Sequence, residues 1–254
     1  MQIADFITEN NAVIFILLFS RISGFFAFLP FFSHATISVN IKTAFALYIT
    51  FLLFPIAVLS NNSIVIDNIM LLVMSEFMIG FLAGVFLNLI FASLSLAGGQ
   101  IAMVMGFSMA NVFDPVSGSN SPIISQMLTL IAIMILLAFD GHHLILIFLS
   151  KSIDSIQLGG FYPSHDILEY MITATSNLFK ISIILAFPII ALSILSDIIF
   201  GMLMKTMPQF NLLVVGFPIK IFLSMLVMMA ILGSIMQIFK NEFLKLFEYL
   251  RYLL

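Results

Sequence analysis

Six long apolar stretches constrain the fold of this chain more than any other feature of its sequence. They cover residues 12–33, 41–59, 69–97, 123–149, 172–200 and 211–239. A transmembrane helix needs about 20 mainly apolar residues, and each stretch reaches about that length. Such a helix satisfies all its backbone amides internally, as lipid requires. The sequence therefore predicts an all-α polytopic membrane protein with about six long hydrophobic helical segments.

The composition agrees with this prediction. Hydrophobic residues make up 62% of the 254 residues and charged residues only 8%, whereas an average soluble domain is about a quarter charged. The absence of cysteine excludes disulfides and thiolate metal sites. The common motifs of hydrolases, zinc proteases, P-loop proteins and dinucleotide-binding enzymes do not occur, so we expect neither catalysis nor a cofactor. No Lys or Arg precedes the first apolar stretch, which we therefore expect to be retained and not cleaved as a signal peptide.

Four ionisable residues fall inside the apolar stretches: Arg21, Glu76, Asp197 and Lys220. Charges at membrane depth are costly, so they usually pair or serve a transport path. Arg21 and Glu76 have opposite charges at similar depths, and we favour a structural ion pair between them. Asp197 and Lys220 can pair in the same way. The alternative is a proton or solute path in which Glu76 and Asp197 titrate.

The sequence DGHH, from Asp140 to His143, places three potential metal ligands in four residues of the fourth stretch. Asp140, His142 and His143 therefore raise the hypothesis of a metal site. Ligand pairs on a helix favour a spacing of four residues, and a catalytic site needs a further ligand and a second shell. We favour a polar break or helix-end cluster that hydrogen-bonds to backbone or to a neighbouring subunit.

Residues 97–122 contain too much glycine for a stable membrane span and are too apolar for an ordinary exposed loop. They indicate a re-entrant or plug-like segment, which must be buried in protein or face water. The residues of interest are Gly98, Gly99, Met103, Met105, Gly106 and Met109, with a turn at Asp114 and Pro115. Glycine permits turns and methionine repacks easily, as a pore seal would require. Without further information the residues favour the alternative, a small-residue helix-packing face.

The sequence PQFNLLVVGFPIK introduces helix breakers into the last apolar stretch. Pro208 can start or kink a helix, and Asn211 can cap free backbone groups. Gly216 and Pro218 are expected to interrupt the helix, and Lys220 follows them. Exposed carbonyls in such a break need neighbours, so we expect protein around this segment. The alternative is a kinked helix in a monomer.

The C-terminal sequence NEFLKLFEYLRYLL has amphipathic helical spacing. Phe243, Leu246 and Phe247 share one face, while Glu242 and Lys245 lie on another. An interfacial helix and a docking helix both fit this pattern.

Five segments in series resemble the FliR family of flagellar export-apparatus proteins, whose counterpart in injectisomes is the SctT family. The segments are SRISGFFAFLPFF from Ser20, EFMIGFLAGVFLN from Glu76, GGQIAMVMGFSMANVFDP from Gly98, DGHH from Asp140 and PQFNLLVVGFPIK from Pro208. Their order and spacing cover nearly the whole chain. The DGHH and Asp-Pro elements look more flagellar than injectisome-like.

The resemblance implies a subunit of the flagellar type III export gate in the bacterial inner membrane and flagellar basal body. FliP and FliQ would be its gate partners, FlhB and FlhA would contact it, and unfolded flagellar proteins would pass through the gate. It also implies a FliP-like part over residues 1–200, a FliQ-like hairpin and tail over 201–254, and a plug from Gly98 to Pro122. An injectisome gate subunit and a small-solute or proton-coupled transporter are the alternatives.

Overall fold

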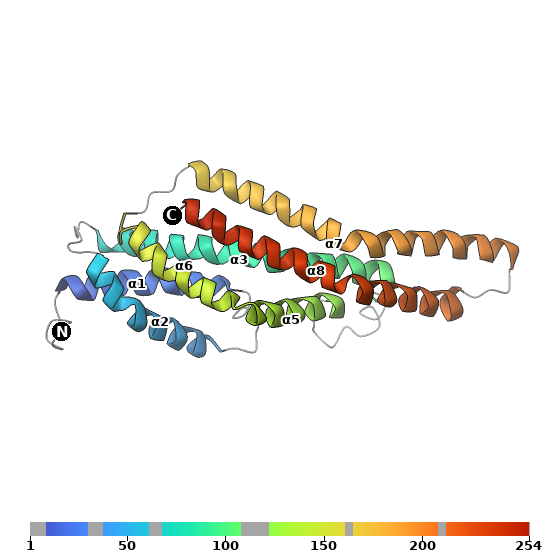
Figure 1. The fold of residues 1–254 in the computed structure, drawn as a ribbon, viewed down its shortest axis with the longest axis horizontal. Helices are drawn as coiled ribbons and strands as arrows, with labels where there is room; N and C mark the ends of the chain where they lie inside the picture. Colours follow the sequence, from blue (N-terminus) through green and yellow to red (C-terminus); the bar gives the residue numbers. More distant parts are fainter. Residues whose placement is uncertain are drawn as a thin grey trace. The chain divides into compact units, whose positions relative to one another are not determined.

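The structure, a computed structural model, describes residues 9–29, 38–60, 68–107, 122–160, 165–207 and 212–253, and within these ranges the chain is all-α with no strand. Its elements are α1 (Glu9–Phe28), α2 (Val39–Ser60), α3 (Ile69–Met105), α5 (Ile123–Ala138), α6 (Gly141–Ser155), α7 (His165–Thr206), the π-helical turn η2 (Leu212–Gly216) and α8 (Phe217–Leu253). Figure 1 shows them in sequence colours. The predicted fold class is confirmed.

Five of the described helices are long and apolar enough to cross a membrane by themselves: α1, α2, α3, α7 and α8. The fourth predicted stretch, residues 123–149, is divided between α5 and α6, which are separate helices because the chain turns at Phe139 and Asp140. The number of spans reaches the predicted six if this broken pair is counted as one. The amphipathic tail continues α8 and is not a separate helix.

The chain divides into two compact units. Unit 1 contains residues 1–89, 137–174 and 243–254, and unit 2 contains residues 90–136 and 175–242. Four helices, α3, α5, α7 and α8, contribute residues to both units. Each unit is therefore built from segments that are distant in sequence.

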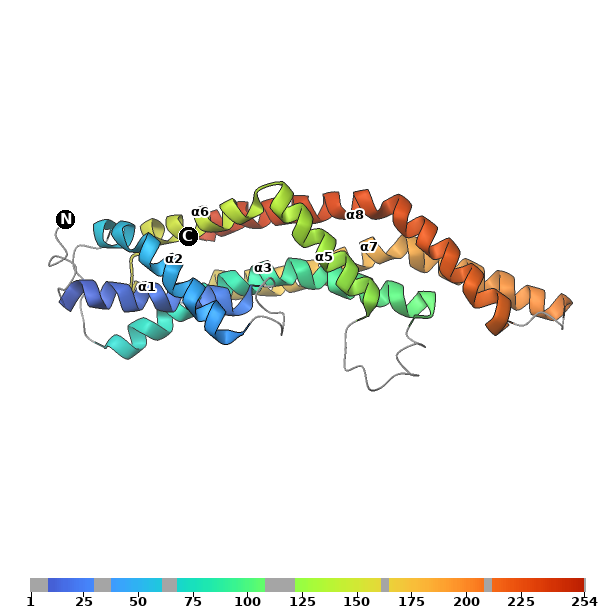
Figure 2. The same ribbon diagram turned by 90° about the horizontal axis from the view of Figure 1, so that it is seen from below.

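In unit 1, α1 packs against α2, and α2 also contacts α6. Figures 1 and 2 show these helices near the N-terminus of the described chain. The interior is formed by apolar side chains of α1 such as Ile14, Leu17 and Phe25, all fully buried. Phe243 at the end of α8 is also fully buried, and its ring contacts Phe139 edge-on. The apolar face predicted for the tail therefore faces the core of this unit.

In unit 2, helices α5, α7 and α8 each contact α3 through small polar or aromatic side chains. The Ser125 hydroxyl on α5 donates to the Ser95 carbonyl on α3 at 2.7 Å. The Ser193 hydroxyl on α7 donates to the Val104 carbonyl on α3 at 2.9 Å. On α8, the ring of Phe239 contacts a phenylalanine of α3 edge-on, with ring centroids 5.0 Å apart. Hydroxyl-to-carbonyl bonds of this kind link helices where apolar packing alone gives little orientation.

Helix α3 extends beyond its predicted end. The sequence places the start of an irregular segment at residue 97, but α3 continues to Met105, so Gly98 and Gly99 are helical. The helix ends where Gly106 adopts a φ of 92°, with the Gly106 amide donating to the Met103 carbonyl and the Phe107 amide to the Ala102 carbonyl. This pattern is a Schellman motif, which requires the left-handed conformation that glycine adopts without strain. The glycine that ends the helix is therefore Gly106.

The expected interruption near Gly216 takes a specific form. Residues Leu212–Gly216 form the π-helical turn η2, and α8 begins at Phe217. Pro218 is the second residue of α8 and follows η2 directly, and as a proline it has no amide hydrogen to donate to the preceding turn. Pro208 and Asn211 lie outside the described residues.

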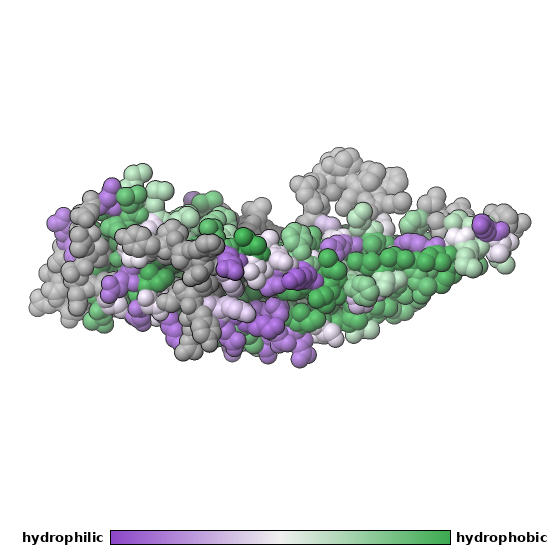
Figure 3. Space-filling view, turned by 90° about the horizontal axis from the view of Figure 1, so that it is seen from above, coloured by the Kyte–Doolittle hydropathy of each residue, from purple (hydrophilic) through white to green (hydrophobic). Residues whose placement is uncertain are grey.

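Unit 2 has extensive exposed apolar surface. The exposed residues of α7 in this unit include Ile183, Ile184, Phe187, Ile194, Leu195, Ile198, Ile199 and Met202. Figure 3 shows hydrophobic side chains covering this part of α7. The helices concerned are long, with 42 residues in α7 and 37 in α8. Lipid or other protein must cover this surface, because an exposed apolar area of this extent is not stable in water.

Candidate functional site

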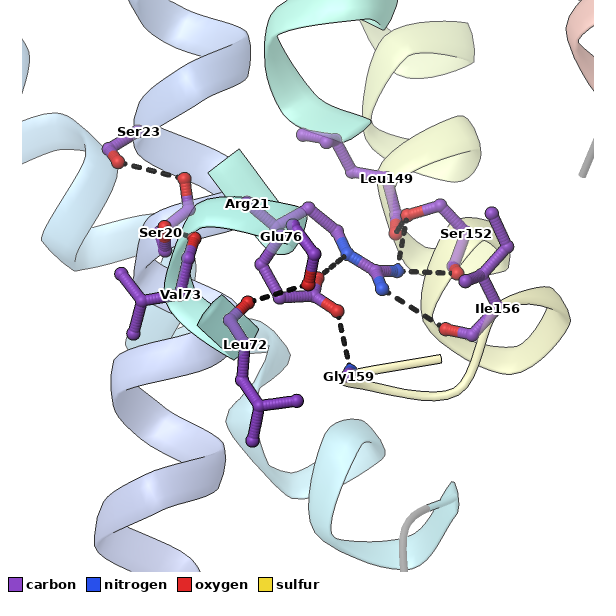
Figure 4. Close-up of polar contacts among 11 residues, drawn as sticks. Ser20, Arg21, Ser23, Leu72, Val73, Glu76, Leu149, Ser152, Ile156 and Gly159 are labelled. Carbon is purple, nitrogen blue, oxygen red and sulfur yellow. Dashed lines mark hydrogen bonds and ion pairs between the residues drawn. The ribbon is translucent and has the colours of Figure 1, made fainter. Parts of the chain in front are cut away.

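An ion pair between α1 and α3 is the centre of a polar network inside unit 1. The Arg21 Nε donates to Glu76 Oε2 at 2.5 Å, and the two side chains are 1% and 0% exposed. Figure 4 shows the pair beside its backbone partners Ser152, Ile156 and Gly159. The sequence predicts this pairing, and the structure confirms it.

Arg21 also closes the C-terminal end of α6. One terminal nitrogen of its guanidinium donates to the Ser152 carbonyl at 2.6 Å, and the other donates to the Ile156 carbonyl at 3.1 Å. The Ser152 carbonyl also accepts the Ile156 amide at 3.2 Å, and carbonyls at the end of a helix carry partial negative charge. The arginine therefore supplies a C-terminal cap from a residue more than 130 positions away in sequence.

Glu76 uses its second carboxylate oxygen to hold the turn that follows α6. Its Oε1 accepts a hydrogen bond from the Gly159 amide at 2.7 Å. Gly159 has a φ of 85°, a conformation that favours glycine. Both oxygens of Glu76 are thus bonded, and the residue has no exposed surface. This arrangement ties α1, α3 and α6 together and leaves the carboxylate without access to a solute.

Glycines allow α1 and α3 to approach closely at the ion pair. A Cβ atom added at Gly80 would overlap the Arg21 carbonyl oxygen, and one added at Gly24 would lie 2.5 Å from the Phe77 carbonyl oxygen. A Cβ at Gly84 would lie 2.7 Å from the Phe25 carbonyl oxygen. Close backbone contact of this kind is the usual use of small residues spaced by four in membrane helices. Helix contact at these glycines positions Arg21 against Glu76.

The DGHH cluster occupies the elbow between α5 and α6. Asp140 has a φ of 57° and precedes α6, while its side chain caps no backbone amide. The Nδ1 atom of His143 lies 3.4 Å from Asp140 Oδ1, and both side chains are exposed. His142 is partly buried, and its ring centroid lies 4.2 Å from that of His143. The predicted polar break is therefore present, because the three side chains gather where the helix is interrupted.

Asp197 and Lys220 form the second predicted ion pair, within unit 2. Lys220 Nζ lies 2.7 Å from Asp197 Oδ1 and 2.8 Å from Oδ2. The pair is unevenly buried, since the lysine side chain is 8% exposed and the aspartate side chain is 60% exposed. One edge of the carboxylate therefore remains open on the apolar surface of α7.

Part of the predicted plug segment belongs to a packed helix. A Cβ at Gly98 would lie 2.6 Å from the Ser125 Cα, so this glycine serves the contact of α3 with α5. Met105 is fully buried, whereas Met103 is 72% exposed. The packing-face alternative therefore holds for Gly98 and Met105. Met109, Asp114 and Pro115 lie outside the described residues.

Sequence reasoning missed the backbone partners of the ion pair and the glycine contacts beside it. Ser152, Ile156 and Gly159 take part mainly through carbonyl or amide groups, which carry no residue-specific signal. The glycines had a signal, because Gly80 and Gly84 have the G-x-x-x-G spacing of closely packed membrane helices.

The sequence matches the family described as bacterial export proteins, family 1, over residues 12–246. The chain belongs to this family. One relative is the flagellar biosynthetic protein FliR of Bacillus subtilis, 31% identical over 243 residues that cover 94% of both chains. The FliR of Aquifex aeolicus is 27% identical over 96% of both chains. The FliR of Escherichia coli is 25% identical over 91% of this chain and 88% of its own.

The family match includes part or all of every described helix of this export-family chain, although α1 begins before residue 12 and α8 ends after residue 246. Arg21, Glu76, the DGHH elbow and the Asp197–Lys220 pair all lie within the matched residues. The resemblance of the five sequence segments to the FliR family is therefore confirmed.

Proposed function

We propose that this protein is a subunit of the flagellar type III export gate in the bacterial inner membrane. The family match over residues 12–246, with relatives named flagellar biosynthetic protein FliR, carries this proposal. Under this proposal the chain forms, together with FliP and FliQ, the conduit through which unfolded flagellar subunits cross the membrane. FlhB and FlhA contact the gate. The chain itself contributes structure and performs no catalysis.

The distribution of polar groups supports a structural role. The Arg21–Glu76 network is buried and fully hydrogen-bonded, so it fixes helix positions. The exposed apolar residues of α7 and α8 offer a large area for neighbouring subunits as well as for lipid. A subunit of a hetero-oligomer needs both properties, namely a rigid interior and an apolar exterior.

The segment from Gly98 to Pro122 is the proposed seal of the conduit. Its first part is the end of α3, where the exposed Met103 and the Schellman turn at Gly106 lead into the following residues. Gly106 lies against the ring of Phe217 at the start of α8, since a Cβ there would be 3.2 Å from that ring.

A proton-coupled or small-solute transporter is less well supported. Such a mechanism would use Glu76 as a titrating group, but both its oxygens are bonded and the side chain is buried. An injectisome gate subunit would share this fold and these contacts. The FliR names of the relatives favour the flagellar assignment.

Gentle detergent extraction of a C-terminally tagged chain, followed by native mass spectrometry, tests the proposal. We expect a large hetero-oligomer that contains FliP and FliQ. An unrelated multi-span protein with the same tag is the control for non-specific association. A stable monomer or homodimer would contradict the proposal and make solute binding the next assay.

Deletion of the gene should abolish motility if the protein serves the flagellum. Unchanged motility would instead favour the injectisome assignment.

A further inference from the structure

The elbow between α5 and α6 holds three metal-ligating side chains that the proposed function does not use. Asp140, His142 and His143 each offer one ligand atom, and these three atoms all lie within 4.8 Å of one another. They come from four consecutive residues, so the local turn alone brings them together. Their proximity therefore does not depend on how any distant part of the chain is placed.

The spacing of two of these ligands already matches a metal site. In a tetrahedral zinc site with bonds of about 2.0–2.1 Å, neighbouring ligand atoms are about 3.3–3.4 Å apart. Asp140 Oδ1 and His143 Nδ1 are separated by 3.4 Å. Both side chains are exposed, so small rotations can complete the approach to a common centre.

His142 supplies an independent observation that points to a ligand. Its Nδ1 atom is buried and has no hydrogen-bond partner among the described residues. A buried nitrogen without a partner is unfavourable, because it has lost water without gaining a bond. A cation that binds this nitrogen at the elbow relieves the deficit by accepting the imidazole lone pair.

We propose that Asp140, His142 and His143 form a binding site for a divalent transition-metal ion, with Zn²⁺ as the best match. Two imidazoles and one carboxylate are a common zinc ligand set and leave a fourth position open. The bound ion joins the residue before α6 to the first turn of α6. It therefore fixes the first turn of α6, since all three ligands lie within residues 140–143 and none comes from α5. The site does not depend on the proposed export function, because binding needs only the folded elbow.

Titration of the purified full-length chain with Co²⁺ tests the site directly. The chain carries an affinity tag without histidine, and it is kept in detergent with any subunits that remain bound. We expect visible absorption of a low-coordinate Co²⁺ site at one equivalent per chain, followed by loss of the signal when Zn²⁺ displaces the cobalt. Absence of this absorption in the unsubstituted chain overturns the proposal.

Substitutions then locate the site. His143→Gln changes an exposed side chain, and Asp140→Asn keeps a residue that tolerates positive φ, so neither should disturb folding. We expect each to weaken Zn²⁺ binding by more than about 10-fold, because even the loss of a group that only supports a metal ligand costs about 10–100-fold. His165→Gln removes a histidine at the start of α7 and should leave the affinity unchanged. Unchanged affinity in the two elbow variants, or an equal loss in His165→Gln, overturns the assignment.

Discussion

The guanidinium of Arg21 neutralises the buried carboxylate of Glu76 and at the same time caps the C-terminal end of α6. A buried ion pair by itself adds little stability, because removing two charges from water is costly. Here the remaining donors of the arginine bond to helix carbonyls, and the remaining oxygen of the glutamate bonds to the Gly159 amide. The network therefore specifies one arrangement of α1, α3 and α6.

Removal of either member of this pair should destabilise the protein strongly. Glu76→Gln leaves a buried guanidinium without its anion, and Arg21→Ala leaves a buried carboxylate; loss of one partner typically costs about 3–5 kcal/mol. We expect low abundance and poor assembly of both variants, measured by quantitative blotting of membranes and by native mass spectrometry. The Arg21→Glu/Glu76→Arg double variant should recover only part of the loss, since a carboxylate at position 21 cannot donate to the α6 carbonyls. A Glu76→Gln protein that assembles fully but fails in transport would instead support a titrating role.

Substitution of Gly80 tests whether close contact between α1 and α3, and not the low helix propensity of glycine, determines stability at this position. Gly80→Ala places a methyl group against the backbone of α1 and should lower the thermal stability in detergent. Gly201→Ala is the matched control, because nothing lies within 4 Å of a Cβ at that position of α7. The control should be neutral or raise stability by up to about 1 kcal/mol through better helix propensity. Equal effects of the two substitutions would contradict the close contact of α1 with α3.

The backbone conformation of Asp140 predicts how three substitutions at this position rank in their effect on stability. A φ of 57° disfavours β-branched residues, so Asp140→Val should cost about 1–2 kcal/mol. Asp140→Gly and Asp140→Asn should be close to neutral, because the side chain caps no backbone amide. Thermal unfolding in metal-free buffer measures all three variants. A neutral Val variant would show that the turn relaxes to another conformation.

The uneven burial of Asp197 and Lys220 predicts that substitutions of the two residues lower the stability by different amounts. Asp197→Ala leaves the buried Lys220 ammonium without an anion, whereas Lys220→Met leaves a carboxylate that is mostly exposed. We therefore expect the aspartate substitution to cause the larger loss of stability in detergent. The double variant should be more stable than Asp197→Ala alone. Equal losses from the two single substitutions would mean that the carboxylate is buried in the extracted protein.

The two methionines near the end of α3 should behave differently. Met105→Ala empties a fully buried position and should cost about 2–5 kcal/mol, while Met103→Ala alters an exposed one and should leave stability unchanged. A short deletion within the stretch from Met103 to Asn111 that keeps Met105 and Gly106 should allow ions to leak across the membrane and leave complex formation intact. Ion conductance of cells that carry the assembled variant measures this effect. An ion-tight deletion variant that still assembles would exclude the seal.

The helices and both ion pairs were accessible from sequence because their signals are strong and local. Apolar runs of about 20 residues and isolated charges inside them stand out in any membrane protein. The end of α3 was misplaced because glycine has two uses. Gly98 allows contact with Ser125 inside a helix, whereas Gly106 ends the helix through positive φ. The sequence alone does not distinguish these uses.

The capping of α6 by Arg21 could not be predicted. The acceptors are carbonyl groups of Ser152 and Ile156, and any residue supplies a carbonyl. Their position depends on tertiary packing across a large sequence separation. The same limit applies to the Gly159 amide bonded by Glu76.

The length of the apolar helices affects the fate of the newly made chain. At a rise of about 1.5 Å per residue, a 37-residue helix such as α3 extends about 55 Å along its axis. The hydrocarbon layer is only about 30 Å thick, and even a tilt of 40° would place about 42 Å across it. Some apolar surface therefore remains outside lipid until other protein covers it. Before assembly the chain is exposed to chaperones and proteases, so its cellular half-life should rise with the supply of its partners.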